Sequence, residues 1–467
     1  MATVEQQIKD FVRSKGVDVV GIAGPERLDG PPSLDLNYTM QGARSIVAIA
    51  LPMDVDAIYK FLGKETPTLH NVDQLFGNQR AFKICMELAE YIRSLGYRAE
   101  VVPSNNTYRR SLDHFSTHPS FSHRFGAIAA GIAGQGWSGN VMTEKYGAAV
   151  YLCTVVTDAV LDSDPAIPPR YFVDNYCDKC RLCARACTSC MFEEDEEEYI
   201  LLNGELHPRG RRRNIDLCNA SCFGLHAISR DKKWSTWGWY WIQDWVGRKP
   251  EARRGKLRFD LMRRGATTGD AALRYDQIRV IGSKLWPQEK IHELPPLEEW
   301  PSDQLEMTRM LREHGEKTFG IKGIRDPNLV TCNHCALVCG PNVKETASRY
   351  NALIAGGIVV PGPEAGTWIR VKDYAEAVAM RKKYPIKVGV LQMVKDALAS
   401  LVLWTRYYFG FEPRSLYQAV VYKFKLKKAV EEYLTGVDTP HRPRPPTDME
   451  GEAPSVAGEV AGTRHER

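Results

Sequence analysis

Two cysteine runs organise this chain of 467 residues: Cys177-Asp-Lys-Cys180-Arg-Leu-Cys183-Ala-Arg-Ala-Cys187 and, much later, Cys332-Asn-His-Cys335-Ala-Leu-Val-Cys339. The first run has the spacing C-x2-C-x2-C-x3-C, and the second has the spacing C-x2-C-x3-C. In the first pattern three thiolates hold one 4Fe-4S cubane, while the fourth cysteine reaches across to a second cubane. The two runs therefore predict an iron-sulfur protein with two 4Fe-4S clusters.

The cysteines divide into two ligand sets, because the second cluster needs ligands from outside the first run. We assign Cys177, Cys180, Cys183 and Cys339 to one cluster, and Cys187, Cys218, Cys332 and Cys335 to the other. Cys222 is the alternative to Cys218. Structural zinc and disulfides are the competing interpretations of such pairs. Structural zinc favours two C-x2-C pairs that close one tetrahedral site. Such a site does not require two interlocking cysteine runs.

The composition is that of an ordinary globular protein. Hydrophobic residues make up 43% of the chain, and the length leaves room for about two or three domains. The net charge of +5, from 62 basic and 57 acidic residues, is too mild and too mixed to argue for nucleic acid. No nucleic-acid partner is therefore expected.

The two ends of the chain bear on its compartment. Residues 1–11 form an amphipathic pattern without an apolar signal core or a twin-arginine pair. The longest apolar stretch near the end, residues 397–404, is too short to span a bilayer. Cysteines kept reduced for cluster binding fit a reducing compartment. We therefore expect a cytoplasmic protein without a transmembrane segment.

Apolar residues recur at helix or strand spacing through the first part of the chain. The expected helices cover residues 4–15 and 78–95, and the expected strands cover 17–23, 45–51, 97–102 and 146–157. Helices that alternate with short buried strands predict an α/β layer. The expected fold class is α/β, or α+β if helices and strands segregate.

Three segments interrupt this alternation. Residues 109–125 carry arginines, histidines and aromatic residues, and we expect them to form a loop over the active site. Residues 126–134 form a small-residue helix that allows close approach of a neighbour or of a large planar cofactor. The aromatic strip at residues 234–245 is expected to pack as core, with the wall of a flat ligand pocket as the alternative.

Two charge runs follow the first cysteine run. The acidic residues 193–198 are expected to form a solvated edge. The basic residues 208–214 are expected to form a surface loop, with contact to an acidic electron donor or an anionic substrate as the alternative. Beyond residue 437 the chain is rich in proline, glycine and glutamate, which predicts a disordered tail.

These features, in this order, resemble the reductive dehalogenases and their relatives, the epoxyqueuosine reductases. The resemblance covers roughly residues 4–222 and 325–345, and its specific part is the pair of cysteine runs. It implies a cobalamin held base-off between a nitroreductase-like α/β core and a ferredoxin-like domain. In that arrangement the nearer cluster passes electrons to cobalt.

The same resemblance implies a division of the chain into five parts. They are an N-terminal unit with the nitroreductase-like cofactor-binding core (1–170), a ferredoxin-like domain with two 4Fe-4S clusters (171–222 plus 325–345), an aromatic-rich insertion between the cysteine runs (223–324), a C-terminal helical extension (346–436) and a tail (437–467).

Candidate catalytic residues come from laying the dehalogenase pattern over this chain. In that family a tyrosine aided by a basic residue supplies a proton, and an asparagine lines the pocket. The asparagine position falls at Asn105 or Asn106, the tyrosine position near Asn78, and the basic position at Tyr151. Asparagine cannot deliver a proton as an acid. Tyr151 or Tyr108 is therefore the expected substitute for the proton donor.

The resemblance implies a cobalamin-dependent iron-sulfur reductase that removes halide from an organohalide. The residues expected at the cofactor are Asn106, Gly134, Gly136, Tyr146 and Thr157. The expected partners are a small-molecule substrate and a reduced ferredoxin, flavodoxin or similar electron donor. The alternatives are a reductase of a non-halogenated substrate, as in the epoxyqueuosine branch, and an electron-transfer protein without catalysis.

Overall fold

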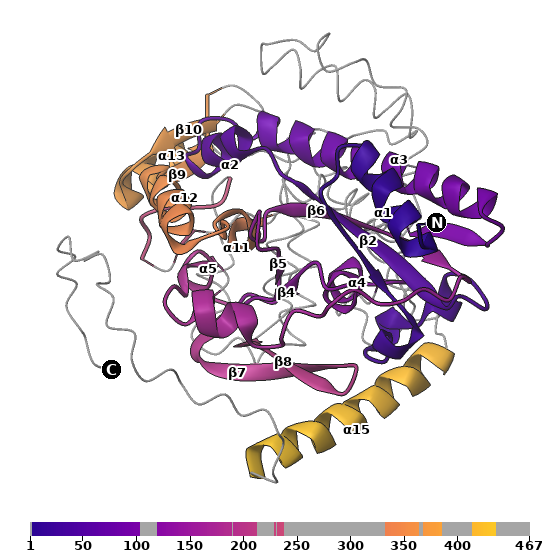
Figure 1. Cartoon of the computed structure of the whole chain (residues 1–467). Helices are drawn as coiled ribbons and strands as arrows, with labels where there is room; N and C mark the ends of the chain where they lie inside the picture. The colour runs from indigo at the N-terminus through magenta and orange to yellow at the C-terminus, as the bar shows by residue number, and fades with distance from the viewer. Residues whose placement is uncertain are drawn as a thin grey trace.

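The computed structural model describes residues 2–102, 119–188, 190–212, 228–229, 231–237, 332–363, 368–384 and 413–435. Within these residues a four-stranded sheet flanked by helices forms the N-terminal core, and both cysteine runs pack beside it (Figure 1).

The sheet has the order β1-β2-β6-β3, and all its neighbouring strands are antiparallel. Its strands are β1 (Val19–Ala23), β2 (Ser45–Pro52), β3 (Ala99–Val102) and β6 (Val150–Thr157). The central pair runs from Ser45 opposite Thr157 to Pro52 opposite Val150. Strand β2 is buried from Ser45 to Leu51 because packed side chains cover both faces of the sheet, which explains its continuous apolar sequence.

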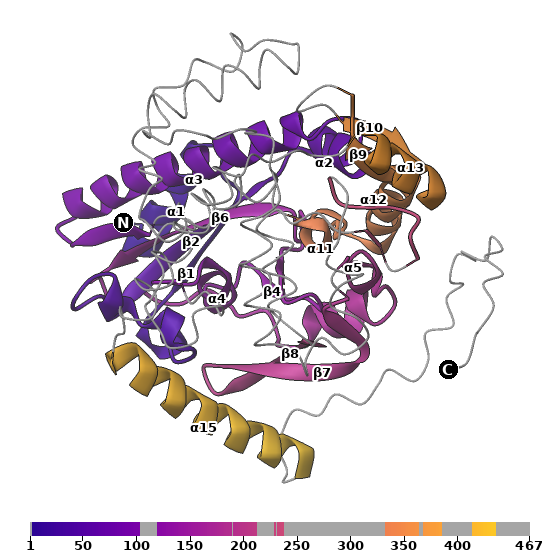
Figure 2. The same cartoon turned by 180° about the vertical axis from the view of Figure 1, so that it is seen from behind.

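Helices α1 (Val4–Ser14) and α3 (Thr68–Ser94) lie on one face of the sheet, and α4 (His123–Ala129) lies on the other (Figure 1 and Figure 2). The first helix begins where the Thr3 hydroxyl accepts a hydrogen bond from the Gln6 N–H at 3.2 Å. The chain leaves it through Gly16, whose φ of +76° suits glycine. The expected α/β layer is confirmed as a mixed α/β architecture.

Helix α4 differs from its prediction. It begins at His123, inside the segment expected to be a loop, and it ends at Ala129 rather than near residue 134. A Cβ atom at Gly126 would lie 2.9 Å from the Phe121 ring and 3.3 Å from Ile46. The small residues of this helix therefore bring it close to its protein neighbours. Residues 109–118 of the expected loop lie outside the described residues.

The two charge runs form a hairpin rather than a free edge and a free loop. Strand β7 (Phe192–Leu202) contains the acidic run, and β8 (Glu205–Arg212) contains the described part of the basic run. Antiparallel pairing places opposite charges side by side. Ion pairs join Arg209 to Glu198 at 2.6 Å, Arg211 to Glu196 at 2.9 Å and Arg212 to Glu198 at 3.8 Å. Most of the basic run is therefore neutralised within the protein.

The C-terminal extension is not purely helical. Gly357, with φ +68°, follows α12 (Val343–Ala355), and the β-branched residues after it form β9 (Ile358–Pro361), which pairs with β10 (Trp368–Val371). Helices α13 (Tyr374–Lys383) and α15 (Pro413–Thr435) complete the described part of the extension. Helix α15 lies along β7, where the Leu201 N–H donates to the Tyr422 hydroxyl at 3.0 Å (Figure 1).

The remaining short elements connect these units. They are η1 (Pro25–Arg27), η2 (Pro32–Leu34), η3 (Leu36–Tyr38), α2 (Val55–Leu62), β4 (Gly134–Gln135), β5 (Val141–Met142), η4 (Val173–Cys177), α5 (Leu182–Arg185) and α11 (His334–Leu337). From the aromatic strip, Trp234 and Trp237 are buried in the core, whereas residues 238–245 lie outside the described residues. None of the helices in the described ranges has the length and apolar character needed to cross a membrane.

Candidate functional site

The two cysteine runs fold into matching helical turns. Arg181 precedes α5 with φ +50°, and Asn333 precedes α11 with φ +47°, so each turn starts from a left-handed residue. The same backbone hydrogen bonds close both turns: Ala184 to Arg181, Arg185 to Arg181, Ala186 to Leu182 and Cys187 to Ala184 in the first; Ala336 to Asn333, Leu337 to Asn333, Val338 to His334 and Cys339 to Ala336 in the second.

This match pairs the cysteines of the two runs one by one. Cys180, Cys183 and Cys187 correspond to Cys332, Cys335 and Cys339. Helices α5 and α11 lie side by side in both views (Figure 1 and Figure 2). The two turns therefore form a pseudo-repeat whose halves face each other. This is expected where each run contributes one cysteine to the cluster that the other run mainly holds.

One pocket gathers the first predicted ligand set. Its lining includes Cys177, Cys180 and Cys183 from the first run and Cys339 from the second. Met142 and Tyr176 are also part of the wall. The backbone of the sheet core holds the second run in place, because the Ala148 N–H donates to the Cys339 carbonyl oxygen at 3.0 Å. The role of these cysteines as ligands stays a prediction, but all four line one pocket.

The second predicted set is described only in part. Cys187, Cys332 and Cys335 lie in the pseudo-repeat and are partly buried. Cys218 and its alternative Cys222 lie outside the described residues. The fourth ligand of this set therefore stays a prediction from the sequence.

N–H groups point at the cysteine sulfurs from the surrounding protein. The Trp137 N–H donates to the Cys177 Sγ at 3.4 Å, and the Met191 N–H donates to the Cys187 Sγ at 3.5 Å. The Asn140 side-chain amide donates to the Cys335 Sγ at 3.2 Å. Hydrogen bonds of this kind orient thiolate ligands and stabilise their charge. Trp137 and Asn140 escaped the sequence analysis because nothing in their local pattern marks them.

Burial makes thiolates costly in this pocket. It raises the pKa of Cys177 to about 11, and the Trp137 N–H and Arg181 offset only part of that rise. Burial and the neighbouring thiols hold the pKa values of Cys183 and Cys339 well above the ordinary range. Crowded sulfurs can all be thiolates only around a cationic centre, which lowers the pKa of the thiols that it binds. The donor set therefore fits a thiolate-ligated iron cluster.

Tyr151 is the candidate proton donor whose side chain is described. It is buried on β6, and its hydroxyl donates to the Asp73 Oδ2 at 2.6 Å. Burial, together with the charge of Asp73, holds the pKa of Tyr151 well above 10. Burial also raises the pKa of Asp73, and the hydrogen bonds from Tyr151 and from the Asp54 N–H only partly offset this. The pKa values of both groups are therefore shifted upward.

Asp73 was missed by the sequence analysis. It lies one helical turn before Gly77 on α3, and a Cβ atom at Gly77 would run into the Tyr151 ring. A lone glycine inside a helical pattern signals such a packing requirement. Asn78, the position where the family pattern expects a tyrosine, lies inside α3, and its side-chain amide donates to the Gln74 carbonyl oxygen one turn earlier at 2.7 Å. The Tyr151 ring thus packs against Gly77, the residue before Asn78. The Asn78 side chain itself is not an acid.

Replacing Asp73 with asparagine should change how stability depends on pH. A carboxyl with a raised folded-state pKa contributes stability below its unfolded pKa, and that contribution is lost as the pH rises through the folded pKa. Asparagine keeps an acceptor for Tyr151 but does not ionise. The stability of Asp73→Asn relative to the natural protein should therefore increase from pH 4 to pH 8 in urea unfolding. Parallel curves for the two proteins over this range would contradict the raised pKa.

The residues predicted to contact the cofactor do not share one site in the described ranges. A Cβ atom at Gly134 would meet Phe172, and one at Gly136 would lie 3.0 Å from the Asn140 carbonyl oxygen. The Thr157 hydroxyl donates to the Arg98 carbonyl oxygen at 2.8 Å. These three residues face protein neighbours. Asn105, Asn106 and Tyr108 lie outside the described residues.

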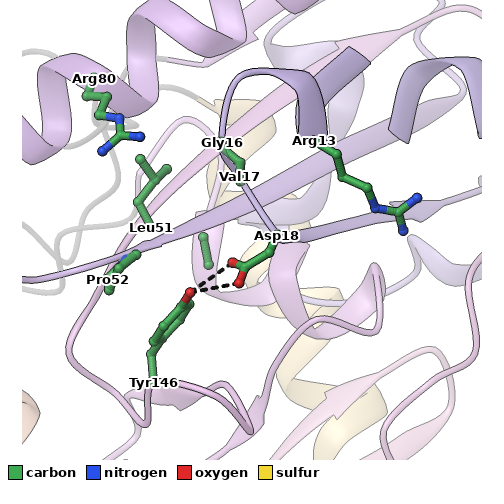
Figure 3. A pocket seen from close by; sticks show the side chains of 9 residues that line it. Arg13, Gly16, Val17, Asp18, Leu51, Pro52, Arg80 and Tyr146 are labelled. Carbon is green, nitrogen blue, oxygen red and sulfur yellow. Dashed lines mark hydrogen bonds between the residues drawn. The ribbon is translucent and has the colours of Figure 1, made fainter. Parts of the chain in front are cut away.

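Tyr146 lines a separate cavity of about 500 Å³ (Figure 3). Its hydroxyl donates to both carboxylate oxygens of Asp18 at 2.9 Å, and Lys145 also bonds Asp18. Burial alone would raise the pKa of Asp18, but these hydrogen bonds outweigh it and lower the pKa. Arg80 and the end of β2 form other parts of the wall. The cavity therefore combines an ionised carboxylate, a phenol and a guanidinium.

Comparison with known proteins gives one relative by sequence and several by structure. No protein-family model matches the chain. The epoxyqueuosine reductase of Gloeobacter violaceus is 24% identical over 291 residues, which cover 54% of this chain and 83% of that protein. The resemblance to the reductive dehalogenases and epoxyqueuosine reductases is thereby confirmed, as a likeness to these enzymes.

Similar solved structures come from both families. A reductive dehalogenase with a suggested B12-dependent mechanism has a TM-score of 0.34 and 17% identity; the match covers 46% of this chain but only 29% of that protein. The epoxyqueuosine reductase of Streptococcus thermophilus has a TM-score of 0.35 and 12% identity, with 93% of this chain and 100% of that one covered.

A third similar solved structure contains a bound ligand. It is an epoxyqueuosine reductase bound to a modified tRNA-Tyr stem loop, with a TM-score of 0.33 and 14% identity over 92% of this chain and 98% of that one.

Proposed function

We propose that this chain is an oxidoreductase that carries electrons through two 4Fe-4S clusters to a corrinoid, in the manner of the enzymes it resembles. The observation that carries the proposal is the position of Cys339. It comes from the second run, yet its side chain lines the same pocket as Cys177, Cys180 and Cys183 of the first. Such an exchange of ligands between runs is the arrangement that holds two cubanes side by side.

The chain supplies the ligands and their surroundings. Cys177, Cys180, Cys183 and Cys339 hold the first cluster, and Cys187, Cys218, Cys332 and Cys335 hold the second. When bound, the clusters supply one-electron transfer and a corrinoid supplies the bond-breaking chemistry. Trp137 and Asn140 orient the sulfurs by donating N–H groups. Tyr176 and Met142 line the first pocket beside these cysteines.

The corrinoid is proposed from the likeness to a B12-dependent dehalogenase. Gly134, Gly136 and Thr157 face protein neighbours, so these three residues do not themselves form a corrinoid cradle. The chain itself supplies the electron path and the proton source.

Tyr151 is the proposed proton source. Its hydroxyl holds a proton in a buried position, and Asp73, which is only partly buried, links it to the surface of the protein. A proton given up at the Tyr151 oxygen can be replaced through the Asp73 carboxyl. The raised pKa of Asp73 favours this role, because a carboxyl that titrates closer to neutral pH accepts and returns protons more readily.

The leading reaction is the reductive removal of halide from a small organohalide. Two electrons from a reduced ferredoxin, flavodoxin or similar donor and one proton replace the carbon–halogen bond with a carbon–hydrogen bond, and halide leaves. The second candidate is reduction of epoxyqueuosine in tRNA. The sequence likeness to an epoxyqueuosine reductase over 83% of that protein favours it.

Anaerobic reconstitution with iron, sulfide and hydroxocobalamin tests the proposal. We expect about eight irons per chain, because two cubanes hold four each, and one cobalt. Fewer than five irons would contradict two clusters, and eight irons without cobalt would reduce the proposal to an electron-transfer protein. Turnover is then measured separately with halogenated phenols and with an epoxyqueuosine-modified tRNA stem loop, using the same reductant. The comparison separates the two reactions.

A further inference from the structure

His334 lies between Cys332 and Cys335 in the second cysteine turn. Its side chain is fully buried, at 0% exposure. The imidazole stacks on Trp234, with ring centroids 5.6 Å apart and planes 25° apart, and it lies 5.6 Å from the Phe61 ring on another side. Two large neighbours therefore fix the position of this ring beside the sulfur ligands.

The contacts of the ring define its tautomer. Nδ1 lies 2.5 Å from the Cys332 carbonyl oxygen and 3.3 Å from the Cys332 Sγ. A carbonyl oxygen only accepts hydrogen bonds, so Nδ1 must carry the hydrogen. Among the residues that the structure describes, the buried Nε2 has no hydrogen-bond partner, which is consistent with a neutral ring. The Nδ1–H thus faces the carbonyl oxygen and the sulfur of the same predicted ligand.

The pseudo-repeat shows what this histidine adds. Its counterpart in the first turn is Leu182, which has the same backbone hydrogen bonds but no donor in its side chain. The helical turn therefore does not need a polar residue at this position. A buried polar ring with one unpaired nitrogen costs free energy relative to leucine. The histidine adds one feature that leucine lacks, an N–H group within hydrogen-bond distance of the neighbouring sulfur.

We propose that His334 is a positioning residue whose Nδ1–H, shared between the Cys332 carbonyl oxygen and the Cys332 thiolate, raises the reduction potential of the second cluster. This inference rests on the proposed function, because it requires a cluster at Cys332. Reduction adds negative charge to a cluster and its sulfurs. A hydrogen bond to a ligand sulfur stabilises that charge and makes reduction easier.

A potentiometric titration of the reconstituted holoprotein, followed by electron paramagnetic resonance, tests the proposal. We expect His334→Leu, which copies the Leu182 counterpart, to make reduction of the second cluster about tenfold less favourable, a negative shift of about 59 mV for one electron. His334→Gln keeps an N–H donor and should recover part of the shift. The control Leu182→Met, in the first turn, should leave both potentials unchanged.

A second measurement detects the histidine next to the cluster in the natural protein. In natural protein labelled with 15N-histidine, the reduced cluster should show a hyperfine coupling to a histidine nitrogen, and His334→Gln should abolish that coupling. This readout keeps the proposal testable if His334→Leu does not fold.

Two results would overturn the inference. One is a full complement of iron in His334→Leu with both potentials unchanged, and the other is a reduced natural protein without histidine coupling. Failure of the proposed function looks different, because the natural protein would then bind no iron and give no cluster signal to titrate.

Discussion

Cys339→Ala should release one cluster, so that the iron content of the reconstituted protein falls from about eight to about four per chain. Cys339 is the ligand that the second run contributes to the pocket of Cys177, Cys180 and Cys183. Alanine leaves three sulfurs around that site and opens a path for water to the missing position. Iron and sulfide analysis, together with the loss of one of two cluster signals, would measure the effect.

The matched control for this change is Cys85→Ala. Cys85 is a fully buried cysteine on α3 and belongs to neither cysteine run, whereas Cys339 is partly buried. Its replacement should cost ~1 kcal/mol of stability through the small cavity that it leaves, with all iron retained. Full iron retention in Cys339→Ala would contradict the ligand assignment. Tight zinc binding in place of iron by the natural protein would favour the competing zinc interpretation.

The first ligand set could be predicted because the short spacing along the chain limits which sulfurs can lie close together. Within the first run, Cys177, Cys180 and Cys183 are close in the sequence and must be close in space. The partner that completes their set comes from far along the chain, and only the general rule that cluster runs exchange a ligand pointed to Cys339. The structure brings it to the same pocket. The identity of the fourth ligand of the second set depends on residues that the structure does not describe.

The hairpin of β7 and β8 shows why other parts could not be predicted. Each charge run taken alone has the composition of a solvated segment. What decides the outcome is pairing between them, which places Arg209 opposite Glu198 and satisfies both charges. A turn at Asn203 and Gly204, with φ values of +50° and +78°, makes this pairing possible. That Asn-Gly hairpin signal is present in the sequence. It lies between two charge runs that each have the composition of a solvated segment.

Gly340 explains one departure from the usual cysteine pattern, in which proline follows the last cysteine of a run. Its N–H donates to the Thr346 hydroxyl at 3.0 Å, a hydrogen bond that proline cannot make. Its backbone also lies against Gly147 of the sheet core. The sequence shows the missing proline but not its reason, because the reason is a contact between segments far apart in the chain.

The same contact leads to the second large effect, which is expected for Gly147→Ala. Gly147 has a φ of +66°, and a Cβ atom there would run into the Gly340 backbone and lie 2.6 Å from the Cys339 carbonyl oxygen. Neither neighbour is a flexible side chain, so the core and the second cysteine turn must move apart. We expect the free energy of unfolding to fall by about 3 kcal/mol or more, because left-handed backbone strain and overpacking act together. Because Cys339 moves with its carbonyl, about half of the iron should be lost.

Gly204→Ala separates the two causes of this loss. Gly204 also has a positive φ, +78°, but a Cβ atom there would meet nothing within 4 Å. It should therefore cost only the left-handed strain, about 1 kcal/mol, and keep all its iron. Urea unfolding and iron analysis of both variants test the difference. Equal losses would mean that backbone strain alone governs Gly147, and that the close approach of Cys339 to the sheet core contributes nothing to holding the cluster.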